Sequence, residues 1–288
     1  MCGKITNFAN KSYLMSEFNR KDIAEFILNS LKSVESDIQQ SITKSKENIP
    51  HFIIDNLLPE DIAQKIHDSF PDSNQLILKN NIRERKLVSA QMNMHSPIIE
   101  ETLFAFQEDE VVRFIDILFG GLQCQPDKTL YAGGISKMEK NHFLNPHLDN
   151  SHDKDRKLFR VLNLLYYVTP NWKKSNGGHL ELWPNGPKDP GILVENKCNR
   201  LVVMLTNQNS WHSVSKVKGD RPRTCISNYY FSKTPPSDTN YFHVTSFRGR
   251  SNQKIKDFIL RNDASLRSLV RRFFKKGIKK NKHYYKKD

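Results

Sequence analysis

Between about residue 128 and residue 232, short apolar runs alternate with turn-forming residues, and this pattern most limits the fold open to the chain. The pieces between the runs are rich in Asn, Gly, Pro, Asp and Lys. The runs are TLYAGGI, HFLNPHLD, FRVLNLLYYV, GGHLELW, GILVE, RLVVML and RTCISNYYF. Many short strands with frequent turn signals predict an all-β barrel or sandwich. Nothing repeats at a fixed period, so a solenoid is not expected.

The residues before this region have mostly helical spacing. Apolar side chains recur at helical intervals over residues 20–45, which predicts an amphipathic helix. A second, short helix is expected over residues 59–70, where one proline opens it and another follows it. A third helical stretch is expected over residues 97–119, with a break near Gln107 and glycines at its end.

Three regions are therefore expected along the chain. Residues 1–125 form a helix-rich supporting region, with strands only near residues 51–58 and 75–78. Residues 126–235 form the β core, and residues 236–288 form a basic tail. The predicted fold class is mainly β with α, that is, α+β.

The composition excludes several classes of protein. The four cysteines lie far apart and form no CxxC pair, which argues against a zinc ribbon and against a disulfide scaffold. No run of about 18 apolar residues occurs, and the N-terminus lacks the apolar stretch of a signal peptide. The expected location is the cytoplasm, with peripheral attachment to a membrane as an alternative.

One short motif points to a metal. His147 and Asp149 lie two residues apart in a segment with strand character, and residues two apart on a strand point to the same side. The pair therefore aims an imidazole and a carboxylate into one cavity. With 10 His and 18 Asp in 288 residues, chance alone gives roughly 0.6 such pairs, so the motif is weak by itself.

A distant histidine and an arginine strengthen the metal interpretation. His212 follows the apolar run RLVVML after a short polar loop, and Arg223 begins the run RTCISNYYF. Two imidazoles and one carboxylate form the facial triad of non-haem iron(II) oxygenases, which leaves coordination positions open. A guanidinium one strand away offers a two-pronged donor for a carboxylate.

Residues 128–232 resemble the prolyl-4-hydroxylase-like branch of the 2-oxoglutarate and iron(II)-dependent dioxygenases. The similarity runs in order through HLDN, LNLLYYVTPNW, GGHLELW, RLVVML, WHSV and RPRTCISNYYF. Each piece alone is modest, but the set in this order is specific. The resemblance implies a double-stranded β-helix, or jelly-roll, core supported by the N-terminal helices.

The resemblance also implies an activity. 2-Oxoglutarate is decarboxylated to succinate with release of CO2, O2 is consumed, and an unactivated C–H bond is hydroxylated, with ascorbate in a supporting role. The implied iron ligands and catalytic residues are His147, Asp149 and His212. A carboxylate at the position of Asp149 favours hydroxylation over halogenation in this family.

The same resemblance places the cosubstrate. Arg223 is the implied anchor for the far carboxylate of 2-oxoglutarate, and Arg221 is its rival because the interval from His212 is slightly longer than usual. Tyr167 matches a position that hydrogen-bonds the cosubstrate. Asn163 shares the face of Tyr167 by strand alternation and is expected to line the same cavity.

Alternatives remain at this point. His179 and Glu181 form a second pair at strand spacing that could hold a metal. The substrate is a protein side chain or a surface-sugar or lipid precursor. A catalytically inactive β-helix that acts as a binding or scaffold protein, and a nucleic-acid demethylase, are the competing functions.

The excess positive charge lies at the end of the chain. Residues 248–288 hold 15 Lys or Arg and three acidic residues, a net of +12, whereas the other 247 residues have a net of +2. A helical stripe among these basic residues predicts a basic amphipathic helix. The stripe consists of Leu266, Leu269, Val270, Phe273 and Phe274.

Three interpretations of this tail remain open: two external partners and docking on the body of the protein. An anionic membrane surface or glycolipid would receive Phe273 and Phe274 at the acyl boundary. Nucleic acid would be bound through its phosphates, with Tyr284 and Tyr285 stacking on bases. In the third interpretation the stripe docks on the body of the protein and the lysines stay solvated.

Overall fold

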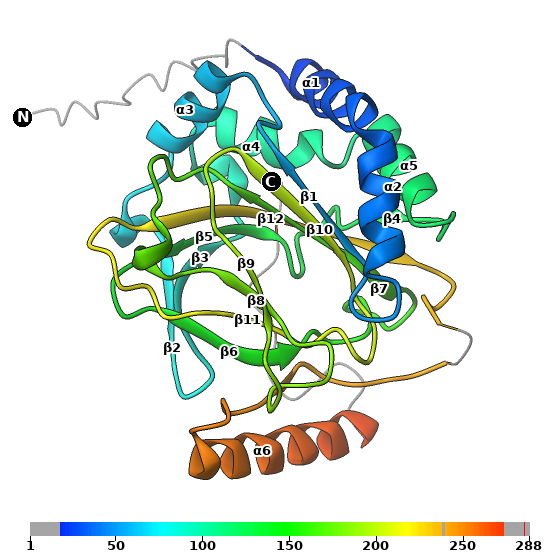
Figure 1. Cartoon of the computed structure of the whole chain (residues 1–288), viewed down its shortest axis with the longest axis vertical. Helices are drawn as coiled ribbons and strands as arrows, with labels where there is room; N and C mark the ends of the chain where they lie inside the picture. The colour runs from blue at the N-terminus through cyan, green and yellow to red at the C-terminus, as the bar shows by residue number, and fades with distance from the viewer. Residues whose placement is uncertain (1–17, 238–239, 274–284, 286–288) are drawn as a thin grey trace, which may run out of the picture.

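The computed structural model describes residues 18–237, 240–273 and 285. One antiparallel sheet forms its centre, and the main path runs in the order β1-β10-β7-β12-β5-β3-β6-β11-β8-β9. Three further strands attach to this path: β13 pairs with β6, β2 with β3, and β4 with β12. The sheet curls, and most helices gather at one end of the molecule while α6 lies alone at the other (Figure 1).

The described strands are β1 (His51–Asp55), β2 (Ile77–Asn80), β3 (Glu84–Ser89), β4 (Gln125–Pro126), β5 (Gly134–Met138), β6 (Phe143–Leu148), β7 (Phe159–Tyr167), β8 (Leu180–Leu182), β9 (Ile192–Val194), β10 (Arg200–Leu205), β11 (His212–Val214), β12 (Arg223–Ser232) and β13 (Ser246–Phe247). The described α-helices are α1 (Arg20–Ser33), α2 (Glu35–Lys44), α3 (Glu60–Asp68), α4 (Pro97–Ala105), α5 (Asp109–Leu118) and α6 (Lys254–Phe273). The predicted mainly-β fold with supporting helices is confirmed.

The two faces of the central sheet have different surroundings: one packs against helices and the other lines a cavity. On β7, Leu164 and Tyr166 belong to a large buried apolar cluster that also contains the inner faces of α1, α3, α4 and α5. The alternate residues Asn163 and Leu165 line a cavity on the opposite face. The helices therefore close one face of the sheet with apolar packing, and the other face is left for a site.

The predicted helices are present with two interruptions. The helix expected over residues 20–45 is divided at Val34, whose backbone leaves the helical region at φ −125° and ψ 25°. The break expected near Gln107 is confirmed, because α4 ends at Ala105 and α5 begins at Asp109. Gly120 then ends the helical region with a φ of +86°, a conformation that glycine adopts without steric cost.

One strand of the sheet was missed in the sequence. The segment 72–95 looked polar and irregular, yet it contributes β2 and β3, and β3 pairs with both β5 and β6. Hydrophobic alternation is absent here because Glu84 and Lys86 face a polar cavity, so both faces of β3 carry polar side chains. Three strands thus come from the region expected to be mainly helical.

The C-terminal helix α6 is attached to the body by one side. Leu260 is fully buried, and Asp257 accepts from Arg248 while Asp263 accepts from Arg83. Leu266 and Leu269 of the predicted stripe are exposed by 63% and 50%, so these two side chains do not pack on the body. Phe274 and Tyr284 lie outside the described residues, as do the lysines between them. No described helix combines the length and the apolarity needed to span a bilayer.

The division of β7 into two faces can be tested with one adjacent pair. Leu164→Ala removes a side chain that is 1% exposed in the helix-backed core, and we expect it to lower the free energy of unfolding by about 2–5 kcal/mol. Leu165→Ala, on the cavity face, should cost less than about 1.5 kcal/mol, because that side chain is only partly buried. Urea unfolding measures both, and equal losses would contradict the assignment of faces.

Candidate metal centre and its pocket

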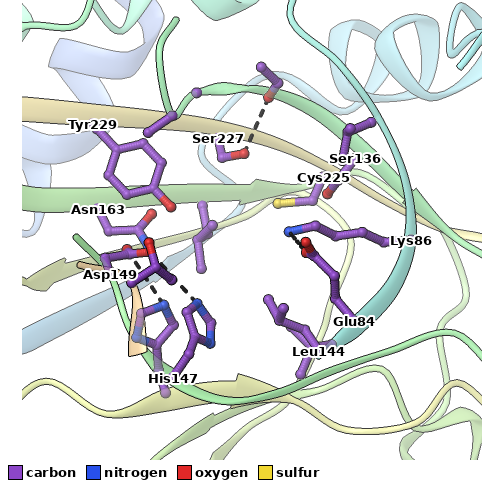
Figure 2. A pocket seen from close by; sticks show the side chains of 18 of the residues that line it. Glu84, Lys86, Ser136, Leu144, His147, Asp149, Asn163, Cys225, Ser227 and Tyr229 are labelled. Atoms are coloured by element: carbon purple, nitrogen blue, oxygen red, sulfur yellow. Dashed lines mark hydrogen bonds and ion pairs between the residues drawn. The ribbon is translucent and has the colours of Figure 1, made fainter. Parts of the chain in front are cut away.

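Strand pairing brings the two predicted histidine ligands together. His147 on β6 and His212 on β11 are direct cross-strand partners, and the centres of their rings lie 4.1 Å apart. Asp149 follows the end of β6 and lies on the same side as His147, as residues two apart on a strand do. Two side chains from β6 and its end and one from β11 therefore converge. Figure 2 shows His147 and Asp149 together at one end of the pocket.

The histidine rings present lone pairs to the carboxylate. Nδ1 of His147 lies 3.0 Å from the carbonyl oxygen of Asn145, and Nδ1 of His212 lies 2.9 Å from that of Ser210. Because a carbonyl only accepts, each Nδ1 carries the proton and each Nε2 is left as a lone-pair donor. These Nε2 atoms lie 3.7 Å from Oδ1 and 3.7 Å from Oδ2 of Asp149.

Burial and neighbouring charges keep these groups in the forms that bind metals. Burial, together with the His212 ring, lowers the pKa of His147 to about 3, so its imidazole is neutral at physiological pH. Burial alone would raise the pKa of Asp149, but Arg160 and the two histidines outweigh it and hold that pKa well below its usual range. Neither His147 nor Asp149 must lose a proton at neutral pH before an ion binds.

The donor set fits a divalent cation. The ligand atoms of His147, Asp149 and His212 all lie within 4.8 Å of one another, and Oδ2 of Asp149 has no hydrogen-bond partner although it is buried. Three electron-pair donors that face each other without a proton between them are stabilised when a cation lies among them. Two imidazoles and one carboxylate are the set that suits non-haem iron(II). The described residues contain no other such group.

A nearby thiol does not alter this donor set. Cys225 lines the pocket, and burial raises its pKa to about 11. A thiol in that state is protonated at neutral pH and is a poor metal ligand, because the thiolate is the ligating form. The site is therefore a nitrogen and oxygen site, which favours iron over a thiolate-bound zinc.

An arginine next to the triad was missed in the sequence. Nη1 of Arg160 lies 3.3 Å from Oδ1 of Asp149, and its Nη2 donates to Asn150 at 2.7 Å. Strand alternation from Asn163 would place Arg160 on the opposite face. A bulge shifts the register, because Tyr230 pairs with Leu162 whereas Phe231 pairs with Arg160, and this turns Arg160 into the pocket. Sequence alternation carries no signal for that shift.

The two candidate cosubstrate anchors differ sharply in position. Arg223 is 2% exposed, lines the pocket, and its guanidinium lies 4.7 Å from the centre of the Tyr167 ring. Arg221 is exposed and does not line the pocket. The pocket has a volume of about 370 Å³ and reaches from the triad to Arg223. Arg223 is thus the arginine placed to meet a carboxylate there.

Of the other two predicted cosubstrate residues, one lines the pocket and one does not. Asn163 lines the pocket beside the triad, as expected from strand alternation. Tyr167 does not line the pocket and packs in a small buried cluster with Leu180 and Val202. Burial raises the pKa of Tyr167, so its hydroxyl keeps its proton. Its role toward the cosubstrate stays a prediction.

The second histidine–carboxylate pair is engaged elsewhere. Nε2 of His179 lies 2.8 Å from the carbonyl of Lys174, and its Nδ1 accepts from the backbone of Asn196. Glu181 accepts two hydrogen bonds from the guanidinium of Arg250 and one from Ser213. Both side chains are engaged in contacts between strands and loops, and they form no metal group with a third ligand in the part of the chain that the structure describes.

A segment beyond the expected β core covers the triad. β13 pairs with β6 so that Phe247 lies opposite His147, and the two rings stack at 5.1 Å with an angle of 17°. Further along, Arg250 holds the segment to Glu181 of β8. The sequence had placed residues 236–288 in a tail, so this cover was missed. Its two-residue strand is too short to give a periodic signal.

Comparisons with known proteins agree with this geometry. Residues 133–231 match the sequence model of the family described as the 2OG-Fe(II) oxygenase superfamily. A prolyl-4-hydroxylase from Pseudomonas putida superposes with a TM-score of 0.51 at 18% identity, over 68% of this chain and 100% of that chain. A prolyl 4-hydroxylase from Phytophthora capsici gives a TM-score of 0.53 at 16% identity, over 91% of this chain and 81% of that chain.

These comparisons establish the fold and a family match for part of the chain. No curated protein matches the chain. At such low identity the two structures show a shared fold, which confirms the double-stranded β-helix predicted from the sequence. The matched segment contains all three triad residues and Arg223. Residues 133–231 of this chain therefore match the 2OG-Fe(II) oxygenase superfamily in sequence, and the fold is similar to that of the prolyl-4-hydroxylases.

Proposed function

We propose that the protein is a 2-oxoglutarate and iron(II)-dependent dioxygenase that hydroxylates an unactivated C–H bond and releases succinate and CO2. The observation that carries this proposal is the meeting of two histidine Nε2 atoms and one carboxylate at the end of a pocket that also contains a buried arginine. A scaffold protein without chemistry has no need for such a set of facing lone pairs. The intact triad therefore favours an enzyme over a degenerate β-helix.

The residues divide the work between metal and cosubstrate. His147, Asp149 and His212 would hold the iron, and three protein ligands leave coordination positions for 2-oxoglutarate and O2. When bound, ferrous ion supplies the redox chemistry that couples dioxygen and 2-oxoglutarate to the C–H bond. Arg223 would bind the far carboxylate of 2-oxoglutarate through its two-pronged guanidinium and orient the cosubstrate toward the triad.

The remaining neighbours keep the site ordered and dry. Phe247 covers one side of the His147 ring, and the backbone carbonyls of Asn145 and Ser210 fix both ring orientations. Arg160 holds the Asp149 carboxylate from outside the triad. A site held this way needs little reorganisation when its ligands arrive, which is the condition for efficient catalysis.

The metal ligands can be tested without knowing the substrate. We expect His147→Ala to weaken ferrous ion binding by about 100-fold or more, because it removes one of three donors. It should also abolish the succinate released on addition of iron(II), 2-oxoglutarate and ascorbate. Anaerobic iron titration and succinate analysis are the measurements. His67→Ala, on α3 and outside the pocket, is the matched control and should bind iron like the wild type.

The assignment of Arg223 as the cosubstrate anchor can be tested with the nearby Arg221 as a control. Arg223→Ala should raise the 2-oxoglutarate concentration for half saturation about 10- to 100-fold, the loss expected for a charge-assisted, two-pronged hydrogen bond. Its iron affinity should change little, since Arg223 is not a ligand. Arg221→Ala should leave both values unchanged because that side chain is exposed. If Arg221→Ala raises the requirement and Arg223→Ala does not, the anchor is misassigned.

A further inference from the structure

The hairpin of β2 and β3 forms a charged wall of the pocket. Lys79 of β2 lies opposite Lys86 in the strand register, and both line the pocket together with Glu84. Nζ of Lys86 lies 3.1 Å from a carboxylate oxygen of Glu84. In Figure 2, Lys86 and Glu84 reach into the pocket from the side opposite Asp149. None of these three residues belongs to the segment that matches the oxygenase family.

Basic side chains outnumber acidic ones around this cavity. The acidic residues are Glu84 and Asp149, so the lining has a net charge of +3. Asp263 of α6, which is not part of the lining, pairs with both Arg83 and Arg267 and so offsets at most one charge of the lining. The pocket thus keeps a net charge of about +2. The basic residues of the lining are Lys79, Arg83, Lys86, Arg160 and Arg223.

Loading the site for catalysis does not remove this excess. Iron(II) adds two positive charges and 2-oxoglutarate adds two negative ones, so the loaded pocket keeps the same sum. Lys79 has no ion pair within 4 Å among the described residues; burial and the charge of Lys86 lower its pKa, and the more distant Glu84 carboxylate only partly offsets this. An uncompensated charge in a partly buried cavity is costly, and a ligand of opposite sign that enters the cavity lowers that cost.

We propose that the substrate carries an acid group, a carboxylate or a phosphate, which binds to Lys79 and Lys86 while its C–H bond faces the triad. This inference rests on the proposed function, since it assumes that 2-oxoglutarate occupies Arg223. Two lysines on one hairpin present compact point charges that suit either acid. The candidate substrates named above were protein side chains and surface-sugar or lipid precursors. The proposed acid site restricts these candidates to those that carry a carboxylate or a phosphate.

Matched pairs of small molecules test the acid group. The protein is loaded with iron(II) and 2-oxoglutarate under argon, and binding of benzoate against benzamide and of phenyl phosphate against phenol is measured by calorimetry. We expect at least one acid to bind about tenfold or more tightly than its neutral partner, and the better acid distinguishes carboxylate from phosphate. Lys79→Met should remove that preference, and Lys79→Arg should keep most of it.

The controls separate this proposal from the function on which it rests. Lys140→Met removes an exposed lysine that pairs with Asp220 outside the pocket, and it should leave the preference intact. Failure of the wild type to take up iron or 2-oxoglutarate would count against the dioxygenase. A loaded wild type that binds no acid saturably, or a Lys79→Met variant that keeps the full preference, would overturn the acid site alone.

An independent observation concerns the outer face of α6. Large apolar side chains recur along one side of this helix at spacings of three and four residues, and they are exposed by 47–80%. Such an apolar stripe, interrupted by Asn262 between Ile259 and Leu266, marks an interaction site on an otherwise charged surface. The stripe consists of Ile255, Phe258, Ile259, Leu266 and Leu269.

Contacts on the opposite side of α6 hold the helix against the body, so that the apolar stripe faces solvent. Leu260 is buried against the body, and ion pairs of Asp257 with Arg248 and of Asp263 with Arg83 hold the helix at two points. Both acidic residues of α6 are used in these pairs, whereas the helix carries six basic residues. The helix therefore presents an apolar stripe with an excess of positive charge around it.

We infer that this face of α6 binds an anionic membrane surface, with the stripe in the interfacial layer and the basic residues near the lipid phosphates. Apolar area and attraction to anionic lipids act together in such helices, and each basic residue near the surface adds to the attraction. The rest of the chain before residue 248 has a net charge of only +2, so the attraction is directed to this end of the molecule.

Vesicle binding tests this surface on the full chain. We expect cosedimentation with phosphatidylcholine vesicles that contain about a third phosphatidylserine, and about tenfold weaker binding without it. Phe258→Glu should weaken the binding about tenfold or more, because it places a charge in the stripe. Met94→Glu makes the same change at an apolar residue that is 67% exposed elsewhere, and should bind like the wild type.

Three results would overturn the membrane assignment. They are absence of binding to the anionic vesicles, equal binding by Phe258→Glu and the wild type, and salt-dependent binding to a DNA or RNA oligonucleotide in place of vesicles. Equal loss in Met94→Glu and Phe258→Glu would show a general charge effect and would also count against it. The iron and 2-oxoglutarate titrations are independent of all these outcomes.

Discussion

Two imidazole lone pairs and one carboxylate lie face to face in a place almost closed to water, and the rest of the structure depends on keeping them there. Such donors gain nothing from one another without a cation, so the sheet must supply the order. The direct pairing of His147 with His212 across β6 and β11 fixes the distance. The hydrogen bonds from both Nδ1 atoms to backbone carbonyls fix the ring directions.

The stability of this arrangement comes from the opposite face of the sheet. Leu164 and Tyr166 of β7 pack into the large apolar cluster under the N-terminal helices, while their neighbours Asn163 and Leu165 face the pocket. One face can carry charged residues that would be unfavourable in a core, because the other face supplies the burial. The helices therefore support the chemistry without contacting it.

Much of the core was predictable because its signals are local and periodic. The apolar runs gave the strands, and spacing by two residues placed His147 and Asp149 on one side. His212 and Arg223 needed the resemblance to a family, since nothing local shows that they meet. The position of Arg160 was not predicted, because a bulge reverses the alternation of β7. β3 was not predicted as a strand, because Glu84 and Lys86 point into the pocket and the expected alternation of apolar and polar residues is therefore absent.

The cover over the triad has a consequence for the order in which the protein folds. The ring of Phe247 stacks on that of His147, and β13 completes the pairing of β6, although 100 residues separate the two in the chain. Contacts between residues so far apart form late, because a long loop must close first. Until β13 has paired with β6, one flank of the first imidazole of the triad lacks its aromatic cover, so the last fifth of the polypeptide supplies the shield for a ligand encoded near the middle of the chain.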